Sequence, residues 1–199
     1  MGGTEGLEDL RAAALAGHTG DAAAARSLAG SDDPEVRAAA LGALARIGDR
    51  ELGRSVARAM ADASPAVRRR AAEVAAAADA VPVTRLADLL ADPDPLVAEA
   101  ACWALGERQD PAGVEPLIVA AGAHPDPLVR EAAVASLGAL GDPRGLPAVL
   151  AATSDKPAVR RRAVLALAPF DGPEVEAALE RARQDRDWQV RQAAEDLLA

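Results

Sequence analysis

The chain has 199 residues, of which half are hydrophobic and only Phe170, Trp103 and Trp188 are aromatic. This length suits one sizeable domain or a short repeat array, and the Ala-, Leu- and Val-rich composition favours thin layers of closely packed helices over the aromatic-filled core of a compact enzyme. The formal net charge of −9 argues against a nucleic-acid partner, because attraction to phosphate dominates such binding.

Other protein classes are disfavoured by what the sequence lacks. A single cysteine excludes an intrachain disulfide framework and a Cys-based zinc site. No apolar run is long enough to span a membrane. The N-terminal MGGTEGLEDL lacks the basic segment followed by an apolar segment that marks a signal peptide. Gly6 stands where N-myristoylation needs Ser or Thr. We therefore expect a cytoplasmic protein with no membrane partner.

In chain order, the first predicted element is a helix within residues 1–18, which we expect to form an N-terminal cap. Residues 19–199 are predicted to form a single continuous repeat domain, because one phrase recurs through them: DDPEVR, ASPAVR, PDPLVA, PDPLVR, DKPAVR and RDWQVR. The valine of this phrase recurs every 30 to 32 residues, at Val36, Val67, Val97, Val129, Val159 and Val190. Six matches at a nearly constant period indicate a repeat architecture.

Each phrase predicts the start of a helix. The expected N-cap residues, whose side chains accept backbone N–H bonds, are Asp33, Ser64, Asp94, Asp126 and Asp187. The next residue is proline in the first five phrases, and proline is well tolerated at the first helical position. Lys156 is a poor cap, and Trp188 replaces the proline in the last phrase, so these two starts are less ideal.

The predicted helices have a regular core face when each valine is counted as position 0. Position 4 is always Ala, position 8 is Leu except for Ala75, and positions 0, 4, 7, 8 and 11 lie on one side of a helix. Each repeat also contains another helix, which follows a turn marked by Asp and has apolar positions that include Leu28, Val56, Leu86, Leu117, Val149 and Leu179. Pro116 and Pro147 fit the first turns of two such helices.

The sequence thus predicts an all-α fold, an α-solenoid of about six helix pairs with a period of 30–32 residues and one extra N-terminal helix. Position 5 is apolar in five repeats and is predicted to pack between neighbouring repeats. In the last repeat it becomes Glu195, followed by Asp196, which predicts an exposed final helix that ends the array.

The phrase DPEVRAAALGALARIGD, residues 33–49, resembles the HEAT-like repeats of the phycobilisome-lyase type, and the resemblance covers nearly the whole chain. Proteins with such repeats include bilin lyase subunits, phycobilisome-handling proteins and many bacterial scaffolds and adaptors. The resemblance implies a binding surface on the concave face, lined by the second helix of each repeat, which here is the helix that begins at the recurring phrase. It also implies that the arginines at position 1 link neighbouring repeats in a ladder, which Ala98 breaks at the third repeat, leaving a weak point or an opening. These arginines are Arg37, Arg68, Arg130, Arg160 and Arg191.

Catalytic chemistry finds little support in the sequence. His18 and His124 lie far apart in predicted turns, and with Cys102 they form no evident nucleophile–base pair. The periodic carboxylates Asp92, Asp94, Asp126, Asp185 and Asp187 are better explained by helix capping than by a metal site. The acidic, aromatic-poor composition also disfavours a DNA glycosylase built on a similar superhelix. We predict no enzymatic activity, no cofactor and no metal site.

The candidate binding residues lie on the helix face opposite the core, which holds positions 2, 6 and 9 with position 3 at its margin. They are Trp103, Arg69, Arg70, Glu99, Glu131, Arg161, Arg162 and Leu165. Arginine pairs flank acidic residues here, and Trp103 and Leu165 supply apolar area, which is typical of protein-binding patches. A helix face that serves only for solvation is the simple alternative, above all for the charged residues.

Two hypotheses of function follow. The first is a non-catalytic scaffold or adaptor, expected to be a monomer, that binds a protein or peptide partner along the concave face with Trp103 as anchor. The second is a bilin-lyase-like or chaperone-like accessory factor for a chromophore- or cofactor-bearing protein. A consensus-designed array is disfavoured, because Ala75 and Ala98 depart from their columns.

Overall fold

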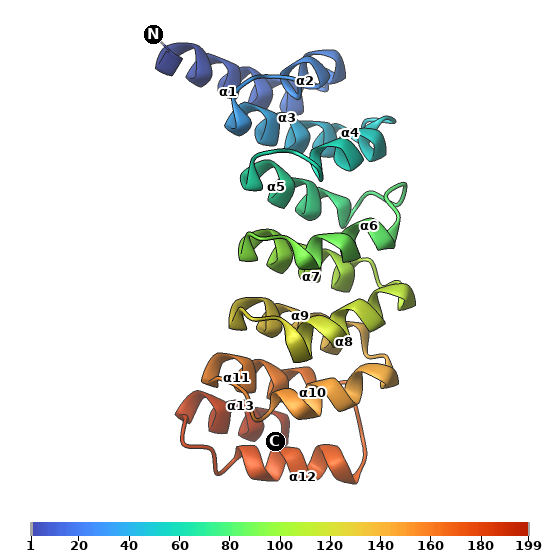
Figure 1. The fold of residues 1–199 in the computed structure, drawn as a ribbon, viewed down its shortest axis with the longest axis vertical. Helices are drawn as coiled ribbons and strands as arrows, with labels where there is room; N and C mark the ends of the chain where they lie inside the picture. Colours follow the sequence, from blue (N-terminus) through green and yellow to red (C-terminus); the bar gives the residue numbers. More distant parts are fainter. Residues whose placement is uncertain (1, 199) are drawn as a thin grey trace.

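The computed structural model describes residues 2–198, with side-chain burial described from residue 6 onward, and these residues form two layers of helices in a curved array (Figure 1). One layer contains α1 (Gly2–Thr19), α3 (Pro34–Ile47), α5 (Pro65–Ala75), α7 (Pro95–Glu107), α9 (Pro127–Leu140), α11 (Pro157–Ala166) and α13 (Trp188–Leu198). The other contains α2 (Ala22–Leu28), α4 (Leu52–Ala59), α6 (Val83–Asp88), α8 (Val114–Ala123), α10 (Leu146–Ala152) and α12 (Pro173–Ala182). Short 3₁₀ turns precede or follow some outer helices, η1 (Leu89–Ala91), η2 (Pro111–Gly113) and η3 (Pro143–Gly145).

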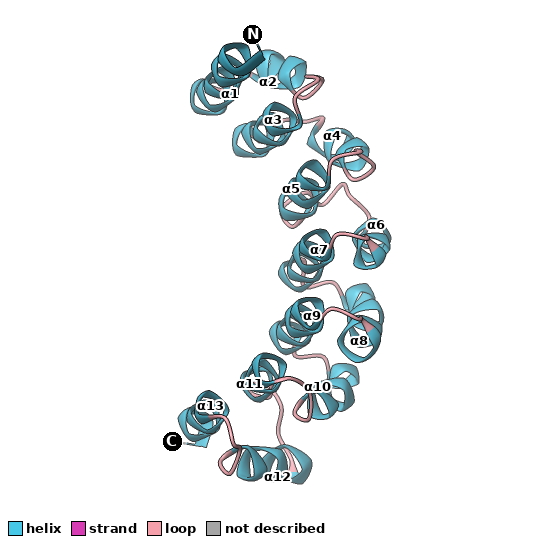
Figure 2. Ribbon diagram, turned by 60° about the vertical axis from the view of Figure 1, so that its left-hand side comes forward, coloured by secondary structure: helices cyan, strands magenta, loops and turns pink. Residues whose placement is uncertain are grey.

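The layer of odd-numbered helices lines the inner side of the arc, and the even-numbered layer lies outside (Figure 2). Each odd-numbered helix packs against the next one, and α1 takes its place in this series by packing on α3. The predicted all-α solenoid is confirmed, and the helices that begin at the recurring phrase form the concave layer as expected. The division of the chain at residue 18 stays a prediction.

The helix starts follow the predicted capping chemistry at four of five positions. The carboxylates of Asp33, Asp94, Asp126 and Asp187 accept the backbone N–H two residues further on, at 2.8–2.9 Å. Ser64 makes no such bond, so this prediction was wrong. The backbone N–H of Ser64 donates to the carboxylate of Asp62 at 2.9 Å, as the N–H groups of Asp94 and Asp187 donate to Asp92 and Asp185.

The core lies between the two layers. All six position-4 alanines are fully buried, as are the outer-layer residues Val56, Leu86, Leu117 and Val149. In the first repeat the corresponding outer residue is Ala25, which is fully buried, whereas the predicted Leu28 is only half-buried. In α2 the residue that faces the core is therefore Ala25, three residues before the predicted Leu28.

Position 9 is not an exposed position in the middle of the array, contrary to the prediction. A Cβ atom added to Gly106 would lie 2.9 Å from the Cβ of Ser136, and one added to Gly138 would lie 2.7 Å from the Cα of Ala166. These glycines lie where α7 crosses α9 and where α9 crosses α11. Their missing side chains allow the inner helices to approach closely.

The predicted arginine ladder is present at four of its five arginines and connects neighbouring repeats. Within residues 2–198, Arg191 of the last repeat donates only to the carbonyl oxygens of Asp185 and Arg186. The pairs are Arg37–Asp62, Arg68–Asp92, Arg130–Asp155 and Arg160–Asp185, and in each the Nε and Nη2 groups donate to both carboxylate oxygens at 2.7–2.9 Å. The Nη1 group of each arginine also donates to one or two carbonyl oxygens of the loop before its own helix. Such bidentate, charge-assisted bonds are stronger than neutral ones. Ala98 removes one rung, as predicted.

We expect the protein to lose stability in acid because of these rungs. The hydrogen-bonded arginine lowers the pKa of Asp62, Asp92, Asp155 and Asp185 below the usual aspartate value. A folded-state pKa below the unfolded value of about 3.9 gives stability that is complete above that pH and is lost as the pH falls through the folded pKa. Thermal melts between pH 7 and pH 2 should therefore show a steep fall in Tm below about pH 4.

The matched control for this pH dependence is Asp185→Asn. Asparagine can still accept the N–H of Asp187, which donates to Asp185 at 2.8 Å, but it carries no charge for Arg160. This variant should be less stable at pH 7, by on the order of 1 kcal/mol, and should lose less on acidification. A variant whose melting curve falls as steeply as the wild type below pH 4 would show that this rung does not contribute.

Candidate binding surface on the inner layer

A hollow of about 500 Å³ lies on the inner layer and brings together residues from four consecutive inner helices, α5, α7, α9 and α11. We call it the Trp103 hollow. Its lining comprises Arg69, Glu73, Glu99, Ala100, Trp103, Leu128, Glu131, Ala132, Ala135, Ser136 and Arg162. Five of the eight candidate binding residues are therefore brought together here: Trp103, Arg69, Glu99, Glu131 and Arg162.

Trp103 is the one aromatic side chain of this hollow. Its residue is 48% exposed, although it sits in the middle of a well-packed helix. The neighbouring Ala100, Ala132 and Ala135 are small, so the indole ring is not enclosed by larger side chains. An exposed tryptophan among small residues leaves apolar area that a partner could cover.

Cys102, the neighbour of Trp103, is fully buried, and the two residues separate as the sequence predicted. Its Sγ lies 3.8 Å from the carbonyl oxygen of Val129 on α9, within the contact between repeats. Burial raises the pKa of the Cys102 thiol to about 12. Because the thiolate is the reactive form, this cysteine is inert in the folded protein.

The charges around the hollow are mostly paired with each other. Arg69 and Arg70 both contact Glu73, at 3.3 Å and 2.9 Å, and Arg162 contacts Glu131 at 3.4 Å. Glu99 forms no ion pair within the described part of the chain. Three of the four arginines expected to meet acidic groups of a partner, Arg69, Arg70 and Arg162, are thus already paired within the protein, and the unpaired charge of the hollow is negative.

Three candidate residues do not line the Trp103 hollow. Arg70 extends across Gly42 of α3, so that a side chain at Gly42 would collide with its guanidinium. Arg161 is exposed outside the hollow, and Leu165 is half-buried and packs against the core. Conversely, the sequence analysis missed Glu73 as a site residue, although its spacing of three and four residues from Arg70 and Arg69 places these charges side by side on one helix.

Residues 2–198 contain no group of three or more His, Cys, Asp or Glu side chains that could hold a metal ion. Within the same residues no helix combines the length and the apolar character required to cross a bilayer.

Comparisons with known proteins agree with this architecture. Residues 83–157 match the family model of HEAT repeats. A search of curated protein sequences finds no match. A designed armadillo repeat protein in complex with the peptide (KR)4 superimposes with a TM-score of 0.65 at 18% identity, covering 87% of this chain and 96% of the designed one.

Two natural structures are similarly related. The complex of CpcE and CpcF of phycocyanin lyase from Nostoc sp. PCC7120 gives a TM-score of 0.64 at 22% identity, covering 89% of this chain and 75% of that one. YibA of E. coli gives a TM-score of 0.67 at 18% identity, with coverages of 86% and 67%. At sequence identities this low, these comparisons show similarity of fold alone. Residues 83–157 thus match HEAT repeats, and the described chain has the architecture of a helical solenoid, as its repeats predicted.

Proposed function

We propose that this protein is a cytoplasmic, non-catalytic scaffold or adaptor that binds a protein or peptide segment along its inner face. The observation that carries the proposal is Trp103, half-exposed in a hollow built by four successive repeats. Tryptophan is strongly favoured among residues that dominate binding energy. The hollow surrounds it with small residues and with charges, which form the rim that such an anchor needs.

The unpaired Glu99 indicates the chemistry of the partner. It lies four residues before Trp103 in α7, so both side chains project from the same face of the helix. A carboxylate next to an indole ring suits a cation, which gains both charge pairing and attraction to the ring face. The partner proposed here therefore presents a Lys or Arg side chain to Trp103. The complex of a designed relative in fold with the peptide (KR)4 supports a basic peptide as a suitable ligand for this architecture.

Replacement of Trp103 tests this proposal directly. Isothermal titration with a (KR)4 peptide at low salt should show binding by the wild type, and Trp103→Ala should weaken it by at least about tenfold, since a hot-spot truncation costs more than 1 kcal/mol. Trp188→Ala is the matched control, because Trp188 is exposed but lies outside the hollow. Equal affinities of the two variants would show that Trp103 is not the anchor.

The second candidate is an accessory factor for a chromophore- or cofactor-bearing protein. The aromatic-containing hollow of about 500 Å³ would also serve that role. The buried Cys102 could not act as an accessible thiol, so the chromophore would be held without covalent attachment to it. Titration with bilins and porphyrins, followed by absorbance, separates the two candidates, because a scaffold for basic peptides should produce no spectral change.

A further inference from the structure

The ladder lacks a rung between the third and fourth repeats, and both partners of that rung are replaced. Ala98 stands where the other repeats carry the arginine. His124 stands five residues before the valine of the next phrase, a place that Asp62, Asp92 and Asp185 occupy in their own loops. The loss of Arg and Asp together leaves no unpaired ladder charge, and it removes the side chains that fill this place between the other repeats.

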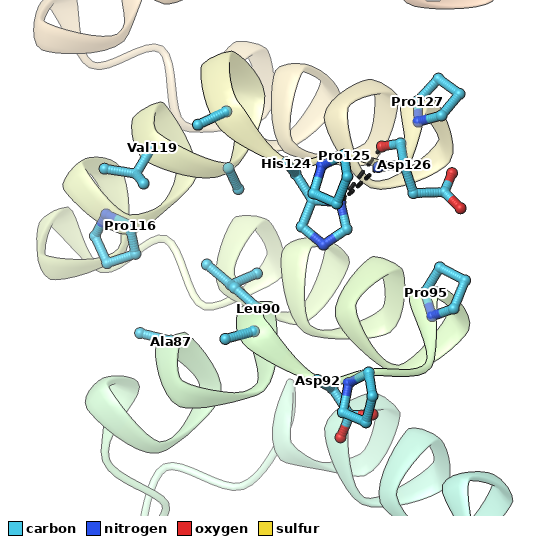
Figure 3. A pocket seen from close by; sticks show the side chains of 14 residues that line it. Ala87, Leu90, Asp92, Pro95, Pro116, Val119, His124, Pro125, Asp126 and Pro127 are labelled. Carbon is cyan, nitrogen blue, oxygen red and sulfur yellow. Dashed lines mark hydrogen bonds between the residues drawn. The ribbon is translucent and has the colours of Figure 1, made fainter.

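A cavity of about 970 Å³ lies at this missing rung, and we call it the rung gap (Figure 3). Its walls come from α6, η1 and α8 and from the loops that precede α7 and α9. They include Leu90, Pro116 and Val119, and Val119 is 60% exposed. Neither Arg nor Lys is among the residues that line the gap. No lining residue is shared with the Trp103 hollow.

His124 provides a hydrogen-bond donor on one side of the rung gap. Its Nδ1 lies 3.1 Å from the backbone nitrogen of Asp126 and 3.4 Å from the carbonyl oxygen of the same residue. In the shorter of these contacts Nδ1 accepts the backbone N–H, and this arrangement places the proton of the neutral ring on Nε2. The Nε2 atom points away from Asp126 and toward the gap (Figure 3). No residue of the described chain accepts a hydrogen bond from this nitrogen.

Backbone carbonyls provide acceptors on the other side. In the neighbouring rung, Nη1 of Arg68 donates to the carbonyl oxygens of Asp62 and Ala63, at 2.9 Å and 3.1 Å. The equivalent carbonyls at the gap belong to Asp92 and Pro93, which line it. With Ala98 in place of the arginine, these two oxygens receive no hydrogen bond from residues 2–198.

The ladder itself shows which chemistry the gap would accept. An ordinary rung places a guanidinium, which is all donor, between carbonyls and a carboxylate, which are all acceptors. Exchange of the Asp for His124 turns one end from acceptor to donor. The complementary group must then have N–H at one end and C=O at the other, as a carboxamide has. A carboxylate would meet the carbonyl oxygens, and a guanidinium would meet the His124 N–H.

We propose that the rung gap binds the carboxamide side chain of a peptide partner, a glutamine flanked by aliphatic residues. Its N–H groups donate to the carbonyls of Asp92 and Pro93, and its oxygen accepts from Nε2 of His124. The aliphatic neighbours cover Leu90 and Val119. Discrimination arises because an analogue without the amide leaves these polar groups unpaired, which is costly in a site lined mainly by apolar atoms.

The test uses four blocked peptides, acetyl-Leu-X-Leu-methylamide with X as Gln, Met, Glu or Arg, titrated into the ¹⁵N-labelled protein and followed by NMR. The Gln peptide should shift the amide signals of residues 119–126 and bind at least tenfold more tightly than the other three. Equal binding of the Met peptide would show that only apolar contacts or the peptide backbone are recognised. Equal binding of the Arg peptide, or no shift at millimolar concentration, would also overturn the proposal.

Two variants test whether the gap itself is the site. The double substitution Ala98→Arg with His124→Asp should rebuild the rung, raise Tm and abolish binding of the Gln peptide. Val119→Arg places a charge on an exposed wall residue and should weaken binding at least tenfold without affecting the fold. Gln-peptide binding that survives both changes would place the site elsewhere. Binding of (KR)4 at the Trp103 hollow should be the same in both variants, so the two proposals can fail independently.

Discussion

Substitution of Leu105 by Ala should lower the free energy of unfolding by about 2–5 kcal/mol, because the truncated side chain leaves a cavity in a packed core. Leu105 is 1% exposed and belongs to α7, the middle helix of the inner layer. Its Cδ2 reaches the start of the outer helix α8, where it lies 3.4 Å from the position a Cβ of Gly113 would occupy. The side chain therefore joins the inner and outer layers at the centre of the array.

The control for this prediction is Leu96→Ala in the same helix. Leu96 is 43% exposed, so its truncation should cost less than about 1 kcal/mol. Urea unfolding followed by circular dichroism measures both variants. In a solenoid each repeat is stabilised mainly by its neighbours, so a defect at the centre should also broaden the transition as the two halves unfold more independently. Equal losses at Leu105 and Leu96 would contradict the assignment of position 8 to the core.

The repeat architecture could be predicted because its signals are local and recur. An Asp-Pro pair at a helix start acts through the backbone of its own first turn, and the position-4 alanine and position-8 leucine follow from the helical period alone. Ser64 shows the limit of this approach. Its place as N-cap was predicted from residue type, but its side chain makes no capping bond. Asp62 of the same loop accepts the N–H of Ser64 itself and also pairs with Arg37 of the ladder.

The details of the inner surface were less predictable because they depend on contacts between repeats. Helix period places position 9 away from the outer layer, yet the curvature of the array presses Gly106 and Gly138 against the next inner helix. Likewise, Arg70 was expected beside Arg69 on the binding face, but its long side chain extends over Gly42 of the preceding repeat. A long side chain can extend toward the preceding or the following repeat, and the sequence does not show which of the two it contacts.

The rung gap lies between these two cases. The absence of an arginine at Ala98 predicted an opening, since the ladder column is visible in the sequence. The role of His124 was missed, because this histidine belongs to the loop of the following repeat. Its replacement of a ladder aspartate is visible only when the loop Asp positions of all repeats are aligned. The width of the cavity depends on α6, η1 and α8, whose outer-layer sequences are the least regular part of the repeat.

Substitution of Gly138 by Val should destabilise the protein by about 3 kcal/mol, because overpacking of a tight helix crossing forces backbone shifts. A Cβ at this position would lie 2.7 Å from both the Cα and the Cβ of Ala166 and 3.1 Å from its carbonyl oxygen. Backbone atoms cannot rotate away as a flexible side chain can, so α9 and α11 must separate. The greater helix propensity of valine compared with glycine offsets only a few tenths of a kcal/mol.

Gly122→Val provides the matched control, since a Cβ at Gly122 in α8 would meet no atom within 4 Å. That substitution should change the unfolding free energy by less than about 0.5 kcal/mol, as expected for an exposed position without special contacts. Urea unfolding of both variants gives the comparison. A small effect at Gly138 would mean that the inner helices can slide apart at little cost. The curvature that forms the Trp103 hollow would then be adjustable in solution and not fixed by the glycine crossings.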